Sequence, residues 1–398
     1  MEIYIHIPFC VRKCAYCDFL SAPGDEEAKE RYVQALCREI DTAGAFVGSE
    51  GKKRVETIFF GGGTPSLLTL PQMSRIMEHI LNVYDLADGA EITVEANPGT
   101  LSEEKLKGFK ALGINRLSLG LQSADDRELT RLGRIHTYED FKQTFRLARK
   151  SGFDDLNVDI MSALPGQTLS SYIKTLEKVT GFEPEHISAY SLIIEPGTAF
   201  EKLYEAGRLN LPSEEEERRM YELTGEWLGR KGYERYEISN YARPGMMCRH
   251  NVGYWVRKDY RGFGLGAASL LDPVRFSNPS DMHTYLALYG DDETIARRLQ
   301  KGFLAVRDTF EEWEILSILR QMEEFMFLGL RMCRGISEKR FLETFGVSVS
   351  DIYGTVIQEH IQEGRLKRRT DEGHNIWLAL TPEGISVSNR VMADFLLD

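Results

Sequence analysis

Residues 4–17 read Tyr4-Ile5-His6-Ile7-Pro8-Phe9-Cys10-Val11-Arg12-Lys13-Cys14-Ala15-Tyr16-Cys17. The three cysteines of this segment have CxxxCxxC spacing, which places three thiolates within eight residues. Three thiolates can bind three irons of a cubane iron–sulfur cluster and leave the fourth iron without a nearby protein ligand. Because an open iron can bind a small molecule, the segment predicts cofactor chemistry rather than a structural crosslink.

Other uses of three close cysteines fit this spacing less well. A disulfide would leave one thiol over, and a zinc site usually needs four ligands, often from two CxxC pairs. An ordinary ferredoxin loop supplies four cysteines with different spacing. His6 could complete a tetrad, but it lies in a predicted strand and would be a less usual ligand. The spacing therefore favours a [4Fe-4S] cluster with one open iron, held by Cys10, Cys14 and Cys17.

Length and composition restrict the class of protein. The chain has 398 residues, 42% of them hydrophobic, which is enough for a large core and favours two or more domains. Its 61 acidic and 49 basic residues give a net charge of −12, which argues against a nucleic-acid partner. Cys37, Cys248 and Cys333 are scattered and are expected to be small core residues. This cysteine usage fits a reducing compartment.

The sequence also indicates where the protein acts. The N-terminus has no basic region followed by a long apolar run, so no signal peptide is expected. No run approaches the roughly 18 apolar residues of a membrane-spanning helix. We therefore expect a cytoplasmic, soluble protein, with peripheral membrane contact and the choice between monomer and homodimer left open.

Short apolar runs alternate with amphipathic segments through the first 230 residues, which predicts a parallel sheet with helical crossovers. The predicted strands are Ile3–Ile7, Val55–Phe60, Glu91–Glu95, Asn115–Leu119, Asp155–Ile160 and His186–Tyr190. The predicted helices are Ala28–Ala43, Pro71–Tyr84, Ser102–Leu112, Tyr138–Lys150, Leu169–Val179 and Ser213–Lys231. Six units are too few for a closed eight-fold barrel, and ligands are expected at the carboxyl ends of the strands.

The cysteine segment resembles the cluster loop of the radical S-adenosylmethionine (SAM) superfamily. The surrounding words IHIPFC and CAYCDF are similar to the branch related to oxygen-independent coproporphyrinogen III oxidases. The resemblance implies that the open iron binds the amino and carboxylate groups of SAM, and that an electron from the cluster cleaves the sulfonium to a 5′-deoxyadenosyl radical. It also implies an α/β fold, an open partial (β/α)6 barrel.

The resemblance and the pattern together predict three regions. Residues 1–232 form the barrel with the cluster and SAM sites. Residues 233–292, rich in short strands, glycines and aromatics, close the barrel, and the glycine-rich stretch 262–267 could close the far side of the SAM pocket. Residues 293–398 begin with a connecting segment to residue 312. A mostly helical, winged-helix-like domain follows, with a basic turn at Lys367–Arg369, a strand near Asn375–Ala379 and a helix start at Thr381.

Two motifs at strand ends are candidates for binding SAM. Gly61-Gly62-Gly63-Thr64-Pro65 follows the second strand, and glycines allow a ligand to approach the backbone closely. Most glycine clusters are only turns, but the resemblance implies that Gly62, Gly63 and Thr64 contact the methionine amino group. The word VEANP ends the third strand, and the family pattern makes Glu95 a SAM contact. The alternative is a solvated Glu95 beside a helix-capping Asn97.

Other polar and aromatic residues complete the predicted pocket. Gln122, Arg134 and Asp159 lie at or after the fourth and fifth strands. They are predicted to form a polar rim around one opening of the barrel, at the carboxyl ends of the strands. The resemblance implies that matching positions contact SAM, some of them a second SAM molecule. It also places Tyr4 near the sulfonium and Tyr16 near the adenine, although both could instead shield the cluster by aromatic packing.

The word His250-Asn251-Val252-Gly253-Tyr254-Trp255 carries a second prediction. A neutral imidazole is a common ligand of haem iron, and aromatic side chains can stack on a macrocycle. A single histidine near aromatics is more often structural, but HNxxYW resembles the signature of the HemW-type haem-chaperone branch. The sequence therefore predicts haem as a third cofactor with His250 as its ligand.

Three functions are possible at this point. The first is a haem chaperone that transfers haem to acceptor haemoproteins, with no catalytic residue assigned. The second is a coproporphyrinogen III oxidase, a decarboxylase of tetrapyrrole propionates, but Phe19 stands where the oxidases extend the loop with a fourth cysteine. A SAM enzyme that modifies RNA is a third reading, and the acidic balance counts against it.

Overall fold

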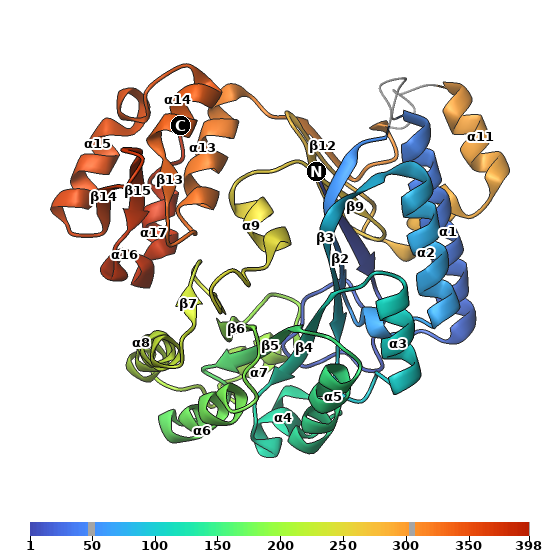
Figure 1. Cartoon of the computed structure of the whole chain (residues 1–398), viewed down its shortest axis with the longest axis horizontal. Helices are drawn as coiled ribbons and strands as arrows, with labels where there is room; N and C mark the ends of the chain where they lie inside the picture. Colours follow the sequence, from blue (N-terminus) through green and yellow to red (C-terminus); the bar gives the residue numbers. More distant parts are fainter. Residues whose placement is uncertain (47–51, 302–306, 398) are drawn as a thin grey trace.

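The computed structural model describes residues 1–46, 52–301 and 307–397. In this part of the chain one mixed sheet has the strand order β12-β11-β10-β9-β1-β2-β3-β4-β5-β6-β8-β7, and a second sheet has the order β13-β15-β14. The large sheet curves, with its helices along the outer side, and α9 lies on the inner side next to the C-terminal domain (Figure 1).

Six consecutive parallel strands form the centre of the large sheet. They are β1 (Glu2–Ile7), β2 (Arg54–Gly62), β3 (Asp85–Ala96), β4 (Arg116–Gln122), β5 (Asp155–Ser162) and β6 (His186–Ser191). All seven residues of β4 are buried, as expected for a parallel strand whose two faces are both covered. The predicted strands are all present, because their apolar runs fit this doubly buried environment.

The crossover helices cover the outside of this sheet. They are α1 (Glu26–Phe46), α2 (Leu70–Val83), α3 (Glu103–Ala111), α5 (Tyr138–Lys150), α6 (Leu169–Thr180) and α8 (Glu214–Arg230). The side chains of Ser102, Thr137 and Thr168 cap the first turns of α3, α5 and α6, which is the start signal that the sequence carries. Three short elements were not predicted, namely η1 (Pro65–Leu67), α4 (Asp126–Leu132) and α7 (Ala199–Glu205).

Strands from later in the chain extend both edges of the six-stranded centre. On one side β8 (Asn240–Ala242) pairs with β6, and β7 (Glu234–Arg235) pairs with β8. On the other side β9 (Tyr260–Phe263) pairs in parallel with β1. Antiparallel pairing then adds β10 (Ala268–Leu271), β11 (Val274–Ser277) and β12 (Glu312–Ile315). The edges do not meet, so the predicted open barrel is confirmed.

The segment from residue 293 to 312 is more ordered than the expected plain connection. It follows α10 (Met282–Tyr289) and contains most of α11 (Asp292–Lys301), while residues 302–306 lie outside the described part. Arg38 of α1 donates to Asp292 at the start of α11 (2.7 Å) and so ties α11 to the barrel. The sequence pattern therefore missed a charged helix in this segment.

The C-terminal domain has a hydrophobic core of its own. Its elements are α13 (Ile318–Gly329), β13 (Ile336–Ser337), α14 (Glu338–Phe345), α15 (Val349–Gln362), β14 (Leu366–Thr370), β15 (Ile376–Leu380), α16 (Pro382–Ser386) and α17 (Ser388–Ala393). The predicted basic turn at Lys367–Arg369 is wrong, because these residues pair with β15 inside β14. The predicted helix start is present, since Thr381 caps α16.

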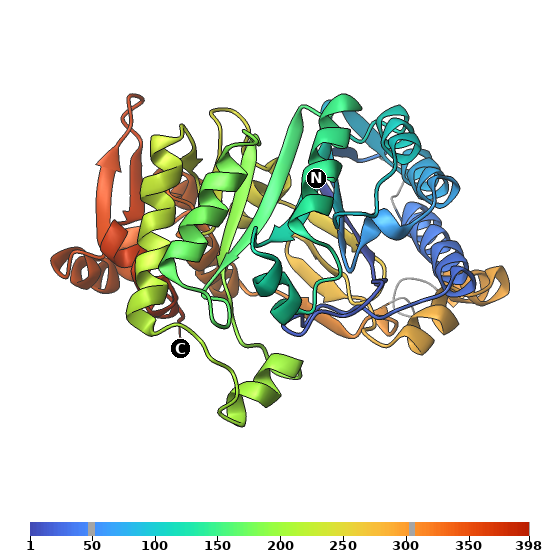
Figure 2. The ribbon, with the colours of Figure 1, turned by 90° about the horizontal axis from the view of Figure 1, so that it is seen from below.

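The helix α9 (Arg249–Trp255) lies between the barrel and the C-terminal domain. Arg257, just after α9, pairs with Asp272 of the barrel side and with Glu324 of α13, both at 2.8 Å. Figure 2 shows the two bodies side by side from another direction. Among the described helices, none has the length and apolar character needed to cross a membrane.

Gly253 of α9 rests directly on the side chain of Glu2 in β1. A Cβ at Gly253 would lie 1.9 Å from Glu2 Oε1, so this close approach requires glycine. Glu2 is 1% exposed, and its Oε2 has no hydrogen-bond partner among the described residues. Burial raises the pKa of Glu2 to about 8, so the carboxyl under α9 is protonated at neutral pH.

We expect Glu2→Gln to change how stability depends on pH. The unfolded carboxyl loses its proton near pH 4.5 and the folded one near pH 8, so between these values the native state binds one proton more. The free energy of unfolding of the wild type should therefore fall relative to that of Glu2→Gln as pH rises, by at most about 1.4 kcal/mol per pH unit. Guanidinium unfolding of both proteins at pH 5.5, 6.5 and 7.5 measures this. A constant difference would contradict the buried protonated carboxyl.

Candidate functional site

The loops after the parallel strands meet at one edge of the sheet and enclose a cavity of about 130 Å³. Most of the residues predicted to hold the cluster and SAM line this cavity: Cys10, Cys14, Tyr16, Cys17, Gly62, Gly63, Thr64, Glu95, Gln122, Arg134 and Asp159. Tyr4 and His250 do not line it. The two residues line a larger adjoining cavity.

The cysteine loop is fixed by backbone hydrogen bonds on both sides. Cys10 N–H donates to Ala22 O (3.1 Å), which closes the loop on itself. Ala15 N–H donates to Leu132 O at the end of α4 (3.0 Å), and Ala15 O accepts from Phe200 N–H in α7 (2.9 Å). The two short helices that the sequence did not reveal therefore anchor the middle of the loop.

A chain of polar side chains links two of the cysteines. Thr64 Oγ1 donates to Cys10 Sγ (3.5 Å), and Arg134 Nη1 donates to Cys14 Sγ (3.6 Å). Asn97 joins these donors, because its Nδ2 donates to Thr64 Oγ1 (2.9 Å) and its Oδ1 accepts from Arg134 Nη2 (2.5 Å). Hydrogen bonds to sulfur stabilise thiolates and tune the potential of a bound cluster. Asn97 thus supports the site, and it does not cap a helix.

The donor set fits a cubane cluster with one open iron. All six cysteines are free, and Cys10, Cys14 and Cys17 are half-buried around one cavity. No three His, Cys, Asp or Glu side chains in the described ranges converge as the ligands of a single metal ion would. A cubane does not need such convergence, because each thiolate binds a different iron.

His6 has a structural role beside this loop. Its Nε2 is hydrogen-bonded to Leu20 O (2.9 Å) and its Nδ1 to Tyr4 OH (3.0 Å). Both ring nitrogens are therefore engaged, which leaves the three cysteines as the protein ligands that the loop offers. Tyr32 OH of α1 donates to the backbone carbonyl of His6 (2.7 Å) and so fixes the end of β1.

Two glycines are required where β2 passes under the cysteine loop. Gly62 has φ +108°, and a Cβ there would lie 2.6 Å from the ring of His6. A Cβ at Gly63 would lie 2.6 Å from the carbonyl oxygen of Phe9. The backbone of this segment can therefore come close to the cavity only because side chains are absent.

Two carboxyl groups face the cavity in a poorly hydrated environment. Burial, and then the nearby Asp159, raise the pKa of Glu95 to about 8. Burial also raises the pKa of Asp159, which accepts hydrogen bonds from Asn157 Nδ2 (2.7 Å) and Ser118 Oγ (3.2 Å). Glu95 accepts from Gly62 N–H (3.2 Å) and is not the solvated side chain of the alternative interpretation. A bound cation or a set of hydroxyl groups would satisfy both carboxyls.

The adjoining cavity is larger, about 430 Å³, and shares Tyr16, Glu95, Gln122 and Asp159 with the first. It extends over the inner face of the sheet to α9. Other residues that line it include Tyr4, Arg116, Asn157, Tyr190, His250 and Tyr254. The two cavities therefore adjoin, and the larger one extends from Cys17 of the cluster loop to His250 of α9.

His250 is held firmly at the far end of this space. Its ring is 1% exposed and stacks on Phe59, with 5.1 Å between centroids. Nδ1 is hydrogen-bonded to Thr57 Oγ1 (2.7 Å) and Nε2 to Tyr254 OH (3.0 Å). Burial and the charge of Arg116 lower the pKa of His250 to about 3, so the imidazole is neutral. Nε2 could bind iron only after its hydrogen bond to Tyr254 OH is broken. The role of His250 as a haem ligand therefore stays a prediction.

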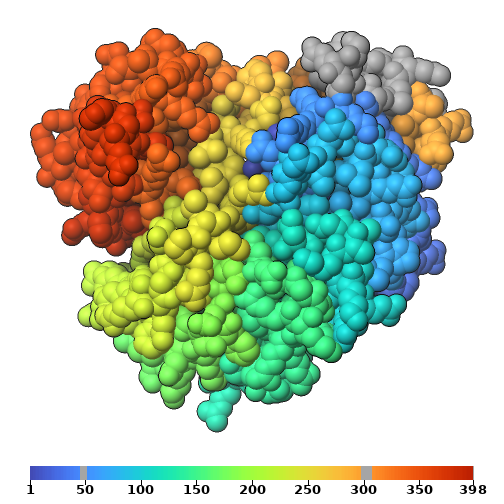
Figure 3. Space-filling view, in the orientation of Figure 1, coloured from blue at the N-terminus to red at the C-terminus, as the bar shows by residue number. Residues whose placement is uncertain are grey.

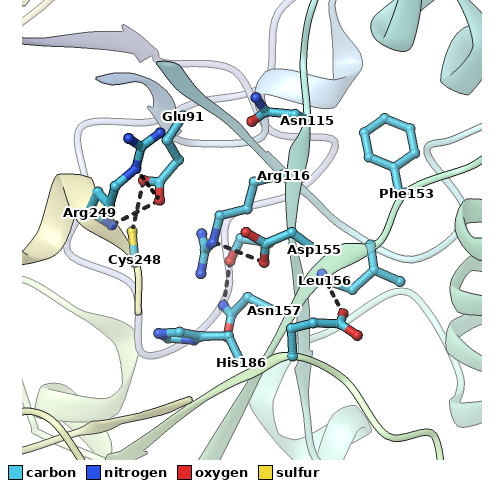
Figure 4. A network of polar contacts seen from close by, with 12 residues as sticks. Glu91, Asn115, Arg116, Phe153, Asp155, Leu156, Asn157, His186, Cys248 and Arg249 are labelled. Atoms are coloured by element: carbon cyan, nitrogen blue, oxygen red, sulfur yellow. Dashed lines mark hydrogen bonds and ion pairs between the residues drawn. The ribbon is translucent and has the colours of Figure 1, made fainter. Parts of the chain in front are cut away.

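Arg116 is a site residue that the sequence did not suggest. It is 2% exposed, and its Nε lies 3.5 Å from Asp155 Oδ1 (Figure 4). An arginine at the start of a strand is normally solvent-exposed, so nothing in the sequence indicated that it points into the cavity. It places a fixed positive charge at the floor of the larger cavity, where it favours an anionic group.

Glu91 positions the start of α9. Its carboxylate accepts hydrogen bonds from the backbone N–H groups of Arg249 (2.8 Å) and His250 (3.1 Å), as Figure 4 shows for Arg249. An acidic group at this end of a helix satisfies unpaired donors and opposes the helix dipole. Because Glu91 belongs to β3, this contact fixes His250 relative to the sheet.

Comparison with known proteins agrees with this geometry. The model of the radical SAM superfamily matches residues 4–179, and that of the HemN C-terminal domain matches residues 316–387. The chain is 41% identical over 399 residues to "Heme chaperone HemW" of Escherichia coli, covering 100% of this chain and 98% of the relative. It is 38% identical over 396 residues to "Heme chaperone HemW" of Bacillus subtilis, covering 99% of this chain and 98% of the relative.

A solved structure confirms the fold. The radical SAM enzyme coproporphyrinogen III oxidase (HemN) of Escherichia coli superposes with a TM-score of 0.81 over 99% of this chain and 89% of that chain, at 22% identity. At this identity the match shows the architecture alone, including the C-terminal domain. The full-length identities with curated relatives go further, and the chain belongs to the HemW heme-chaperone family of the radical SAM superfamily.

Proposed function

We propose that this protein is a haem chaperone, which binds haem and transfers it to acceptor haemoproteins. The observation that carries the proposal is the full-length similarity to HemW heme chaperones, at 41% identity with the Escherichia coli relative. The larger cavity, which extends from Cys17 of the cluster loop to α9, supports it. A cytoplasmic location is part of the same proposal, because the site needs a reducing compartment.

The residues around the smaller cavity would hold the cluster and SAM. Cys10, Cys14 and Cys17 would bind three irons, and the fourth would be left for the amino and carboxylate groups of SAM. The chemistry that this pair supplies is one-electron cleavage of the sulfonium. The chain contributes the backbone at Gly62 and Gly63 and a loop fixed by α4 and α7.

The polar side chains would orient SAM within the cavity. A cationic amine beside Glu95 would restore its charge, because an opposite charge lowers a raised carboxyl pKa. Thr64 and Arg134 would keep the cluster loop in place through Asn97. Gln122 and Asp159 would accept or donate hydrogen bonds at the rim, and Tyr4 and Tyr16 would cover the two ends.

Oxidative decarboxylation of a tetrapyrrole is the second candidate function. The words IHIPFC and CAYCDF resemble the oxidase branch, and the fold shared with HemN, at a TM-score of 0.81, is compatible with this activity. Phe19 argues against it, because a 59% exposed phenylalanine at the edge of the site stands where the oxidases carry a further cysteine. The full-length identity with heme chaperones also favours the first function.

Replacing Cys14 with alanine should abolish cluster assembly, since two thiolates cannot hold the cubane. After anaerobic reconstitution with iron and sulfide, the wild type should contain about four irons per chain, and Cys14→Ala almost none. Cys37→Ala is the matched control, because Cys37 is buried in the core far from the loop. Equal iron and sulfide contents in wild type and Cys14→Ala would contradict the proposed ligand set.

Glu95→Gln should weaken SAM binding and leave the cluster intact. The substitution removes the charge that faces the methionine amine, which we expect to lower affinity by about tenfold. SAM titration of the reduced cluster, followed by its electron paramagnetic resonance spectrum, measures the change. Glu56→Gln alters an exposed glutamate that pairs with Lys258 and should behave as wild type. Unchanged SAM affinity in Glu95→Gln would remove Glu95 from the SAM site.

The two candidate functions predict different results in a haem-transfer assay and a decarboxylation assay. The haem-loaded protein should transfer haem to an apo-haemoprotein such as an apo-cytochrome. The Soret band of the acceptor should appear faster than when haem is supplied by albumin. Anaerobic incubation of the reconstituted protein with coproporphyrinogen III, reductant and SAM should yield no protoporphyrinogen. Formation of protoporphyrinogen with turnover would overturn the chaperone in favour of the oxidase.

A further inference from the structure

A second large cavity lies outside the barrel, in the groove between α9 and the C-terminal domain. Its volume is about 400 Å³, which is within the range of small-molecule sites. The space-filling view shows the C-terminal domain, in orange and red, against the segment in yellow that contains α9 (Figure 3). We call this cavity the arginine groove, after its lining residues Arg235, Arg257, Arg334, Arg340 and Arg369.

The helix α9 faces both cavities. His250, Asn251 and Tyr254 line the space inside the barrel, whereas Val252 and Trp255 line the arginine groove. The residues of the word HNxxYW are therefore divided between two sites. This motif can therefore contribute to haem binding through Val252 and Trp255 in the groove, while both hydrogen bonds of His250 stay intact.

The walls of the arginine groove suit a flat apolar molecule. Apolar and aromatic side chains come from both bodies: Val252 and Trp255 from α9, Phe325 from α13, Ile336 from β13 and Trp377 from β15. Three sulfur-containing residues, Met247, Met332 and Cys333, also line the groove. Arg334 covers one face of Trp377 (3.7 Å) and Arg331 one face of Trp255 (4.4 Å), so a macrocycle would stack on their other faces. Methionine or cysteine sulfur can bind haem iron.

The charge of the groove is opposite to that of the protein. The chain has a net charge of −12, yet the described residues that line the groove include five arginines and no aspartate or glutamate. Of these arginines, Arg235, Arg340 and Arg369 have no carboxylate within ion-pair distance among the described residues, whereas Arg257 and Arg334 are paired. Arg235 stacks on the rings of Tyr221 and Tyr241, and Arg340 and Arg369 donate to backbone carbonyl oxygens. Three guanidinium groups without a carboxylate partner around one apolar groove form a site for an anionic ligand.

Unused hydrogen-bond donors point to the same conclusion. Arg235 Nε and Nη2 and Trp255 Nε1 are buried and have no acceptor among the described residues. Arg340 donates to Val256 O (2.8 Å), and burial together with Arg257 lowers its pKa. Buried donors without acceptors are costly, so a ligand that brings carboxylates would stabilise this wall.

We propose that the arginine groove binds haem, with the macrocycle between the apolar walls and its two propionates against the unpaired arginines. This inference rests on the proposed haem-chaperone function and gives it a location. Haem combines a flat apolar body with two carboxylates at one edge, and the groove offers the complementary arrangement. SAM carries a positive charge at its sulfonium, which the arginines disfavour.

The groove lies between the two bodies, and no residue of the cysteine loop lines it. A chaperone must release its ligand to another protein. A ligand held between α9 and the C-terminal domain can leave without passing the cluster loop, so cluster chemistry and haem transfer occupy opposite faces of one helix.

Charge-neutral substitutions test the groove directly. Haem titration of the reconstituted full-length protein, followed by Soret absorbance, should show at least about tenfold weaker binding for Arg340→Gln/Arg369→Gln. Glutamine removes the positive charge and keeps a hydrogen-bond donor on the side chain. The matched control is Arg127→Gln/Arg218→Gln, two exposed arginines on α4 and α8, and should bind as wild type. His250→Ala should also keep its affinity within about twofold.

Changing the ligand gives a test that does not depend on the folding of any variant. Haem dimethyl ester lacks the free carboxylates, so the wild type should bind it at least about tenfold more weakly than haem. The double arginine variant should bind haem and its ester almost equally, because the arginines that distinguish them are gone. Iron-free protoporphyrin IX should keep the dependence on Arg340 and Arg369.

The outcomes separate this inference from the proposed function. If the wild type binds no haem, the haem-chaperone proposal itself fails. If the wild type binds haem but the double arginine variant and the ester make no difference, only the groove is wrong. Loss of the Soret band in His250→Ala, with full binding in the arginine variant, would place haem inside the barrel.

Discussion

Parallel pairing of β1 to β6 is the constraint on which the site depends. Because neighbouring strands run in the same direction, the loops at their carboxyl ends come to one edge of the sheet. Residues that are far apart in the chain, such as Gly62, Glu95 and Asp159, thereby line one cavity with the cysteine loop. The open sheet leaves room on its inner face for α9.

The helix α9 connects this cavity to the C-terminal domain. Glu91 holds its first turn, Gly253 lies against the buried Glu2, and Arg257 pairs with Glu324 of α13. Each of these contacts joins α9 to a different element. A change in the position of the C-terminal domain would therefore act on the same helix that carries His250 and Trp255, which gives the cluster site and the arginine groove a physical link.

The two cavities differ in charge, which assigns them different ligands. The smaller cavity contains Glu95 and Asp159, and burial raises the pKa of both carboxyl groups. A cationic ligand would relieve both. The arginine groove contains guanidinium groups without carboxylates, so an anionic ligand stabilises it. Among its described lining residues the groove of this acidic protein has arginines and no acidic side chain, which suits the proposed dianionic macrocycle.

The cluster loop, the six strands and most of their helices followed from the sequence alone, since CxxxCxxC spacing, doubly buried apolar runs and capping serines are local signals. The positions of Gly62, Gly63 and Glu95 at the ends of strands also followed from local patterns, whereas their roles toward SAM came from the family resemblance and stay predictions. Tertiary structure decided the rest: that Arg116 points inward, that Asn97 joins Thr64 to Arg134, that β14 is a strand, and that α4 and α7 anchor the cluster loop. The arginine groove has the same origin, because its residues come from segments whose meeting depends on how the C-terminal domain packs against α9, and no local pattern encodes that contact.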